Sequence, residues 1–89
     1  MAVCKRVYYR GRVQGVGFRY TAQSLARGYP VSGYVRNLPT GQVELVAEGD
    51  AGAVQSFLDA VARQMTDHIQ EQSVTDEPPQ AYQGFVIRG

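Results

Sequence analysis

A glycine-containing segment near the N-terminus has the residue types and spacing to bind an anion. Residues 11–19 read GRVQGVGFR. Glycines allow successive backbone N–H groups to point into one concavity, because no Cβ stands in the way. The segment precedes an apolar pattern of helical spacing, and the first turn of a helix exposes unpaired N–H groups and partial positive charge. This arrangement predicts a cradle for a phosphate or a carboxylate.

Arg19 lies in the first turn of that expected helix. The helix dipole disfavours a cation there by about 0.3–1 kcal/mol, and no acidic residue is near it in the sequence. A bound anion would reverse this penalty through a bidentate contact with the guanidinium group. The alternative is an exposed side chain that reaches solvent or the acidic half of the chain. The local pattern does not choose between these two interpretations.

Asn37 is the second candidate, at the end of an expected strand and just before the turn at residues 38–41, which read LPTG. Taken alone, an asparagine in this position is typical of a turn. Its carboxamide also carries a donor and an acceptor, so it could orient a water molecule without being ionised. A right-handed crossover could bring this strand close to the glycine segment.

Several other chemistries are excluded by what the sequence lacks. No Lys-Ser or Lys-Thr pair follows the glycines, and Tyr20 stands where a dinucleotide fingerprint requires its third glycine. The only cysteine and the only histidine, Cys4 and His68, do not make a dedicated zinc site. His68 is also far along the chain from the glycine turn, which leaves little scope for a catalytic triad.

Hydrophobic periodicity predicts the elements that position these residues. Alternating apolar residues indicate strands at 3–13, 31–37, 42–48, 69–76 and 84–88. Helical spacing indicates helices at 18–27 and 51–66, and the second helix places an apolar stripe in the core: Val54, Phe57, Leu58, Val61 and Met65. The order β-α-β-β-α-β predicts an α+β, ferredoxin-like fold with an antiparallel sheet and two helices on one face. A chain of 89 residues suits one domain, spanning residues 1–89.

The charges are distributed unevenly along the chain. Residues 1–43 hold seven basic and no acidic residues, whereas residues 44–89 hold two basic and eight acidic ones, a balance of 2 − 8 = −6. The total of +1 excludes a typical disordered tail or a supercharged nucleic-acid arm. The basic half indicates either an anionic partner or pairing with the acidic half after folding.

The composition also favours a cytoplasmic location. A single cysteine, Cys4, cannot form an internal disulfide, which favours the reducing cytoplasm. No apolar stretch is long enough for a signal peptide or a membrane span. We therefore expect a cytoplasmic location.

Two blocks of the sequence resemble the signatures of the acylphosphatase family. Residues 11–19 are similar to the first signature, and residues 33–49, GYVRN followed by GQVELVAEG after the turn, are similar to the second. The similarity runs from residue 5 to residues 85–87, although the last third matches mainly in hydrophobic pattern. Thr40 departs from the acidic residue often found before the turn glycine. Because this is a turn position, we expect no loss of activity.

The resemblance implies hydrolysis of the carboxyl–phosphate bond of an acyl phosphate, which yields a carboxylate and inorganic phosphate. It implies that Arg19 is the phosphate-binding catalytic arginine and that Asn37 positions the attacking water. It further implies that the phosphate cradle consists of backbone N–H groups, those of Gly15, Val16, Gly17, Phe18 and Arg19. The resemblance also implies that the reaction needs no metal and no cofactor, and that no phosphoenzyme intermediate forms. We expect a monomer that acts on a small molecule, with neither nucleic acid nor membrane as a partner.

Three alternatives compete with this interpretation. RNA-recognition domains share the β-α-β-β-α-β order but stack bases on aromatic residues of the third strand, and residues 42–48 here are acidic without an aromatic ring. A non-catalytic regulatory domain is disfavoured by the presence of both Arg19 and Asn37. The acylphosphatase-like domain of a carbamoyl-transfer maturation protein is disfavoured because the chain ends two residues after Ile87, which favours a stand-alone enzyme.

Overall fold

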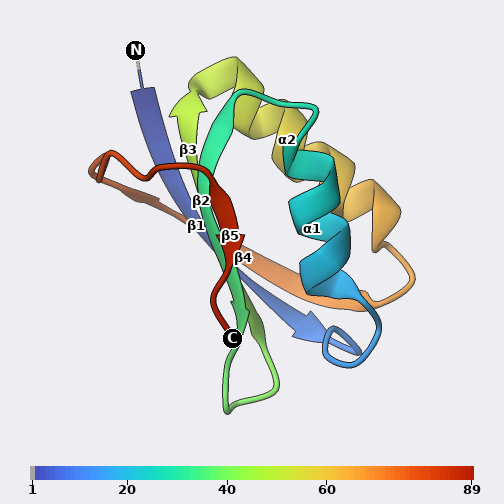
Figure 1. Ribbon diagram of the computed structural model, residues 1–89. Coiled ribbons are helices and arrows are strands. Elements are labelled where there is room, and N and C mark those ends of the chain that lie inside the picture. Colours follow the sequence, from blue (N-terminus) through green and yellow to red (C-terminus); the bar gives the residue numbers. More distant parts are fainter. Residues whose placement is uncertain (1) are drawn as a thin grey trace.

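The chain folds into one five-stranded sheet covered by two helices (Figure 1). The computed structural model describes residues 2–89. Its elements, in chain order, are β1 (Ala2–Gly11), α1 (Phe18–Ala26), β2 (Val31–Asn37), β3 (Val43–Asp50), α2 (Ala51–Gln64), β4 (Ile69–Glu77) and β5 (Phe85–Ile87). The predicted ferredoxin-like fold is confirmed, and every predicted element is present with bounds that differ by at most two residues.

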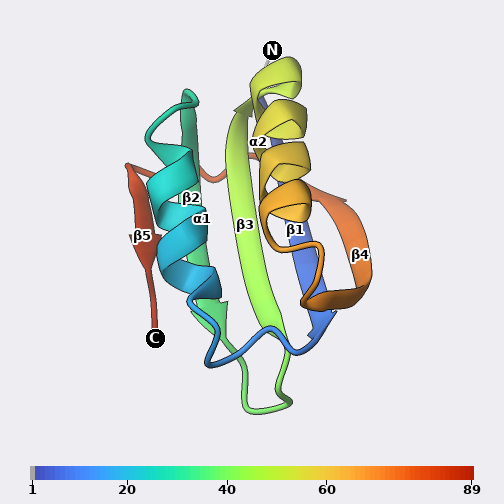
Figure 2. The same ribbon diagram turned by 90° about the vertical axis from the view of Figure 1, so that its right-hand side faces the viewer.

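The strands are arranged in the order β4-β1-β3-β2-β5, and both helices lie on one face of the sheet (Figure 2). Three pairs, β1 with β3, β1 with β4 and β2 with β3, are antiparallel as predicted. The sheet is nevertheless mixed, because β5 runs parallel to β2 and places Gly33 opposite Phe85 and Val35 opposite Ile87. The cause is the segment 78–84, which crosses from one edge of the sheet to the other on the face away from the helices (Figure 1).

The core lies between the sheet and the two helices. The predicted stripe of α2 is buried throughout, and the alternating residues Val7 and Tyr9 of β1 face it. Phe18, the first residue of α1, is buried against Tyr9 with the two ring centroids 4.8 Å apart. Burial of each such side chain contributes about 1.5–3 kcal/mol. This packing fixes the start of α1, next to Arg19, relative to β1. In residues 2–89, neither helix has the length and apolar content that a bilayer crossing requires.

The first strand ends at Gly11, two residues before its predicted end. The register between β1 and β4 shifts between Arg10 and Gly11. At Gly11 the two chains approach so closely that a Cβ atom would lie 2.5 Å from the carbonyl oxygen of His68, and φ is +127°. Only glycine fits this position. The chain leaves the sheet at this point, and two residues later the side chain of Val13 is buried in the core.

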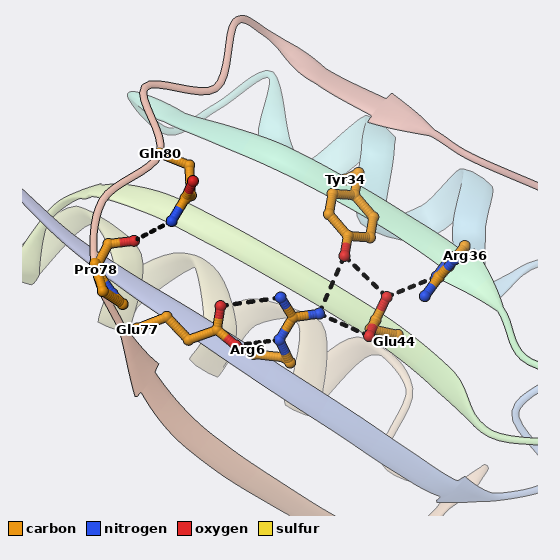
Figure 3. Close-up of polar contacts among 7 residues, drawn as sticks. All are labelled: Arg6, Tyr34, Arg36, Glu44, Glu77, Pro78 and Gln80. Carbon is orange, nitrogen blue, oxygen red and sulfur yellow. Dashed lines mark hydrogen bonds and ion pairs between the residues drawn. The ribbon is translucent and has the colours of Figure 1, made fainter.

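The face of the sheet away from the helices carries a network of charged side chains (Figure 3). Glu44, on β3, is only 2% exposed and accepts hydrogen bonds from Arg6 (2.7 Å), Arg36 (2.6 Å) and the Tyr34 hydroxyl (2.9 Å). Arg6 also forms an ion pair with Glu77. Burial acts to raise the pKa of Glu44, but the hydrogen bonds from Arg36, Tyr34 and Arg6 together outweigh it and hold the pKa below its ordinary value.

Pairing with the acidic half accounts for much of the uneven charge distribution. Besides the Arg6 and Arg36 contacts, Lys5 pairs with Asp76, and Arg10 pairs with Glu71 at 3.0 Å. Lys5 with Asp76 and Arg10 with Glu71 are directly opposite each other in the sheet register, as are Arg36 and Glu44. The basic and acidic halves therefore meet as cross-strand pairs, an arrangement that stabilises a sheet.

The segment 78–84 is held over the same face by a single carboxylate. Glu48, on β3, accepts hydrogen bonds from the backbone N–H groups of Gln80 (2.5 Å), Ala81 (3.2 Å) and Tyr82 (3.2 Å). The Tyr82 ring packs edge-on against Tyr34, with centroids 5.9 Å apart. The sheet face that RNA-recognition domains use for base stacking is therefore occupied here by carboxylates and by the chain itself.

Candidate active site

Three chain segments meet at one end of the sheet (Figure 2). They are the loop between β1 and α1, the turn between β2 and β3, and the residues that follow β5. The first holds the glycine segment, and the second directly follows Asn37. The two candidate regions of the sequence thus lie at the same end of the sheet, an arrangement that the expected crossover made possible.

The loop between β1 and α1 presents free backbone donors. Gly15 has φ of +75° and Gly17 has φ of +80°, and a Cβ atom at either would meet nothing within 4 Å. Glycine is needed here for its left-handed backbone rather than for space. Gly17 occupies the N-cap position of α1 without a side-chain capping bond. Within residues 2–89, the N–H groups of Gly15, Val16 and Gly17 donate no hydrogen bond, so they remain available to an anion.

Arg19 projects from the first turn of α1. Its Nη1 atom donates to the carbonyl oxygen of Gly89. Among residues 2–89 Arg19 forms no ion pair with an Asp or Glu side chain, and its contact with Gly89, a residue of the C-terminal half, is exposed. A guanidinium group has five N–H donors. The single contact with Gly89 leaves donors for a bound anion.

Asn37 is the last residue of β2, and its side chain has an unusual environment. Its backbone N–H donates to the carbonyl oxygen of Gly89 at 3.4 Å. Its side-chain Oδ1 atom is buried and has no hydrogen-bond partner among the described residues. A buried acceptor without a donor is costly, by about 1–3 kcal/mol. Such an atom is suited to accept a hydrogen bond from a water molecule or a ligand.

Gln14 is a residue of the site that the sequence-based reasoning did not select. Its side-chain nitrogen donates to the carbonyl oxygens of Leu38 (2.8 Å) and Gln42 (2.9 Å), which flank the turn after Asn37. Its partners lie 24 and 28 positions away in the sequence. No local pattern could have indicated this contact, because it depends on the tertiary approach of two loops.

The family was established by comparison with known proteins. A family model described as Acylphosphatase matches residues 5–87. The chain belongs to the acylphosphatase family. The acylphosphatase of Thermotoga petrophila is 38% identical over 84 residues, which cover 93% of each protein. The crystal structure of acylphosphatase from Bacillus subtilis superposes with a TM-score of 0.87 at 36% identity and covers 100% of both chains.

This chain also matches a small part of a much longer protein. The crystal structure of full-length HypF in the phosphate- and nucleotide-bound form matches this chain with a TM-score of 0.86 and 26% identity. The match covers 100% of this chain but only 12% of that one. By contrast, this chain and the Thermotoga petrophila and Bacillus subtilis acylphosphatases match over nearly their whole lengths. The predicted membership of the acylphosphatase family is therefore confirmed.

The positive charge of this acylphosphatase-family site is local. Arg10 precedes the first signature block and pairs with Glu71, and Arg36 lies within the second block and pairs with Glu44. Arg12, in the loop between β1 and α1, and Arg19, in the first turn of α1, form no ion pair with an Asp or Glu side chain of residues 2–89. Within residues 2–89, no three His, Cys, Asp or Glu side chains gather into a group that could hold a metal ion.

Proposed function

We propose that this protein hydrolyses the carboxyl–phosphate bond of a small acyl phosphate, with Arg19 and the backbone of residues 15–19 binding the phosphoryl group and Asn37 positioning water. One observation carries this assignment. The free N–H groups of the glycine loop, the Arg19 guanidinium and the unpartnered Oδ1 of Asn37 belong to segments that meet at one end of the sheet. Membership of the acylphosphatase family supports the same reaction.

The phosphoryl oxygens accept hydrogen bonds from the N–H groups of Gly15, Val16, Gly17, Phe18 and Arg19. The start of the α1 dipole adds partial positive charge at the same point. The Arg19 guanidinium offsets the charge of the dianion through two parallel N–H donors. These donors stand ready before the substrate arrives, and by analogy with oxyanion holes each contributes about 2.7–4 kcal/mol to the transition state.

The Oδ1 atom of Asn37 accepts a hydrogen bond from the attacking water and holds its oxygen in line with the bond to be broken. The water oxygen bonds to phosphorus, and the bond between phosphorus and the acyl oxygen breaks. The acyl group leaves as a carboxylate, and a phosphate oxygen of the substrate takes the water proton. An acyl phosphate dianion and water thus give a carboxylate anion and dihydrogen phosphate. Because a carboxylate is a good leaving group, no general acid is required.

We also propose that the protein acts as a monomeric single domain, residues 1–89, in the cytoplasm and without a nucleic-acid partner. The coverage of the sheet face by residues 78–84 supports the last point, and the buried position of the single cysteine, Cys4, is compatible with a reducing compartment. Light scattering coupled to gel filtration tests the monomer directly.

The deciding experiment measures phosphate release from a small acyl phosphate in the presence of a metal chelator. We expect saturable hydrolysis that the chelator leaves unchanged. An alkyl phosphate monoester serves as the matched control, and we expect no turnover of it because its alkoxide leaving group would need a general acid. Phosphate release no faster than the spontaneous rate would refute the assignment.

A further inference from the structure

The amide of Gln14 joins the two halves of the site. Its Nε2 atom donates to the carbonyl oxygens of Leu38 at 2.8 Å and Gln42 at 2.9 Å. Both partners are acceptors only, so the nitrogen of the amide must face them, and both of its hydrogens are used. Gln14 therefore contributes no Nε2 hydrogen to a bound phosphate.

The turn at residues 38–42, to which Gln14 donates its hydrogen bonds, is closed by backbone hydrogen bonds within the turn. The N–H of Gly41 donates to the carbonyl oxygen of Leu38 (3.1 Å). The N–H of Leu38 donates to the carbonyl oxygen of Gln42 (2.9 Å). Each of the two carbonyl oxygens thus accepts one backbone bond and one bond from Gln14. Because both acceptors belong to this hydrogen-bonded turn, Gln14 attaches the glycine loop to a turn whose conformation is fixed.

The chain neighbours of Gln14 and of its acceptors indicate that these hydrogen bonds set the position of the glycine loop relative to Asn37. Gln14 lies between Val13, which is buried, and Gly15, which begins the free donors of the loop. On the other side, Leu38 is the residue directly after Asn37. The Gln14 amide therefore connects the glycine loop to the turn that follows Asn37, with one chain neighbour on each side.

We propose that Gln14 is a positioning residue that sets the separation between the phosphate cradle and Asn37. This inference rests on the proposed function. Gln14 does not touch the substrate but holds the cradle at the distance at which the water on Asn37 lies in line with the phosphorus atom. Its loss leaves the cradle itself intact, because Gly15, Gly17 and Arg19 keep their own backbone and helix. The loss therefore affects the turnover step more than phosphate binding.

The main test is Gln14→Met, which keeps the length of the side chain and removes both donors. A small displacement of reacting groups can lower a rate by about 100-fold. We expect kcat to fall by about 10- to 100-fold, while the inhibition constant for inorganic phosphate changes by less than about 3-fold. Thr40→Ala is the control, because it removes a polar side chain of the same turn that, among residues 2–89, forms hydrogen bonds only with Gln42. We expect its kcat to stay within about 2-fold of the parent value.

A second variant, Gln14→Asn, and an NMR titration with inorganic phosphate test the proposal even if Gln14→Met does not fold. Gln14→Asn keeps a polar amide that is too short to span both carbonyls, and we expect it to lower kcat in the same direction. In the parent protein, titration with inorganic phosphate should shift the NMR signals of Gly15 and Gly17 and, in step with them, the side-chain amide signals of Asn37. In Gln14→Asn the glycine signals should still move, and the Asn37 response should be less than half as large.

The outcomes separate the two proposals. Failure of the parent protein to hydrolyse any acyl phosphate would refute the proposed function, whereas the phosphate titration would still test the coupling through Gln14. Hydrolysis by the parent together with an unchanged kcat in both Gln14 variants would overturn the inference. A loss of phosphate affinity as large as the loss of kcat would also overturn it, because Gln14 would then shape the cradle itself.

Discussion

Arg19 and Asn37 donate to the same acceptor, the carbonyl oxygen of Gly89. Arg19 contributes its Nη1 atom, and Asn37 contributes its backbone N–H at 3.4 Å. The segment after β5 thus lies against both residues that we propose to carry out the reaction. Since one oxygen accepts from both, the Arg19 side chain is held beside the end of β2.

Arg19→Gln should remove both phosphate binding and turnover, because the uncharged amide cannot offset the charge of the phosphoryl group. We expect kcat/KM to fall by at least about 100- to 1,000-fold and inhibition by inorganic phosphate to be lost. The free energy of unfolding should change by no more than about 0.5 kcal/mol, because the contact with Gly89 is exposed. Steady-state kinetics and urea unfolding measure these effects. Arg27→Gln, at the other end of α1, is the control, and an equal loss there would mean that net charge matters more than position.

Asn37→Ala should lower turnover and preserve phosphate binding. Without its Oδ1 atom the attacking water is no longer held in line, and we expect kcat to fall by about 100-fold. The inhibition constant for phosphate should change by less than about 3-fold. Because this Oδ1 has no partner among the described residues, its removal breaks no hydrogen bond and should not lower the free energy of unfolding by more than about 0.5 kcal/mol. Loss of phosphate binding in this variant would contradict the division of roles between Arg19 and Asn37.

Gly17→Ala tests whether the loop needs a left-handed backbone. At φ of +80° with nothing within 4 Å of a Cβ, the cost is conformational and amounts to about 1–2 kcal/mol. We expect that loss of stability together with weaker inhibition by phosphate, measured by urea unfolding and kinetics. Gly52→Ala, in the first turn of α2 and equally open, should instead stabilise the protein by about 0.4–1 kcal/mol. Stabilisation by Gly17→Ala would show that the loop does not depend on this conformation.

The Glu44 network predicts how stability depends on pH. In the folded protein the pKa of Glu44 lies below the ordinary value of 4.5, and Arg6 likewise lowers the pKa of Glu77. As pH falls through about 4.5, the unfolded chain takes up protons that the folded protein resists. The stabilisation is therefore complete above pH 4.5 and is lost as pH falls through the folded pKa values.

Glu44→Gln should lower the free energy of unfolding at pH 7 by about 1–3 kcal/mol and reduce its decline in acid. Urea unfolding from pH 7 to pH 3 measures both effects. Glu71→Gln disrupts the exposed pair with Arg10 and should cost less than about 1 kcal/mol. An equally steep acid decline in Glu44→Gln would show that other carboxylates control the pH dependence.

The sequence by itself determined the elements and much of the candidate site. Strand and helix periods depend on residues only two to four positions apart, so the alternation of Val7 and Tyr9 and the stripe of α2 could be recognised locally. The glycine segment indicated an anion cradle because it directly precedes a helical pattern. Asn37 taken alone was typical of a turn, and its role in positioning water was implied by the resemblance to the acylphosphatase family.

The tertiary structure decided which of these residues meet. The parallel pairing of β5 with β2, the bonds of Gln14 to Leu38 and Gln42, and the contact of Arg19 with Gly89 join residues 24 to 70 positions apart. The ion pairs of Arg6 with Glu44 and of Arg10 with Glu71 also join residues that are far apart in the sequence. Such contacts depend on strand order and register, which follow from how the whole core packs rather than from any local period.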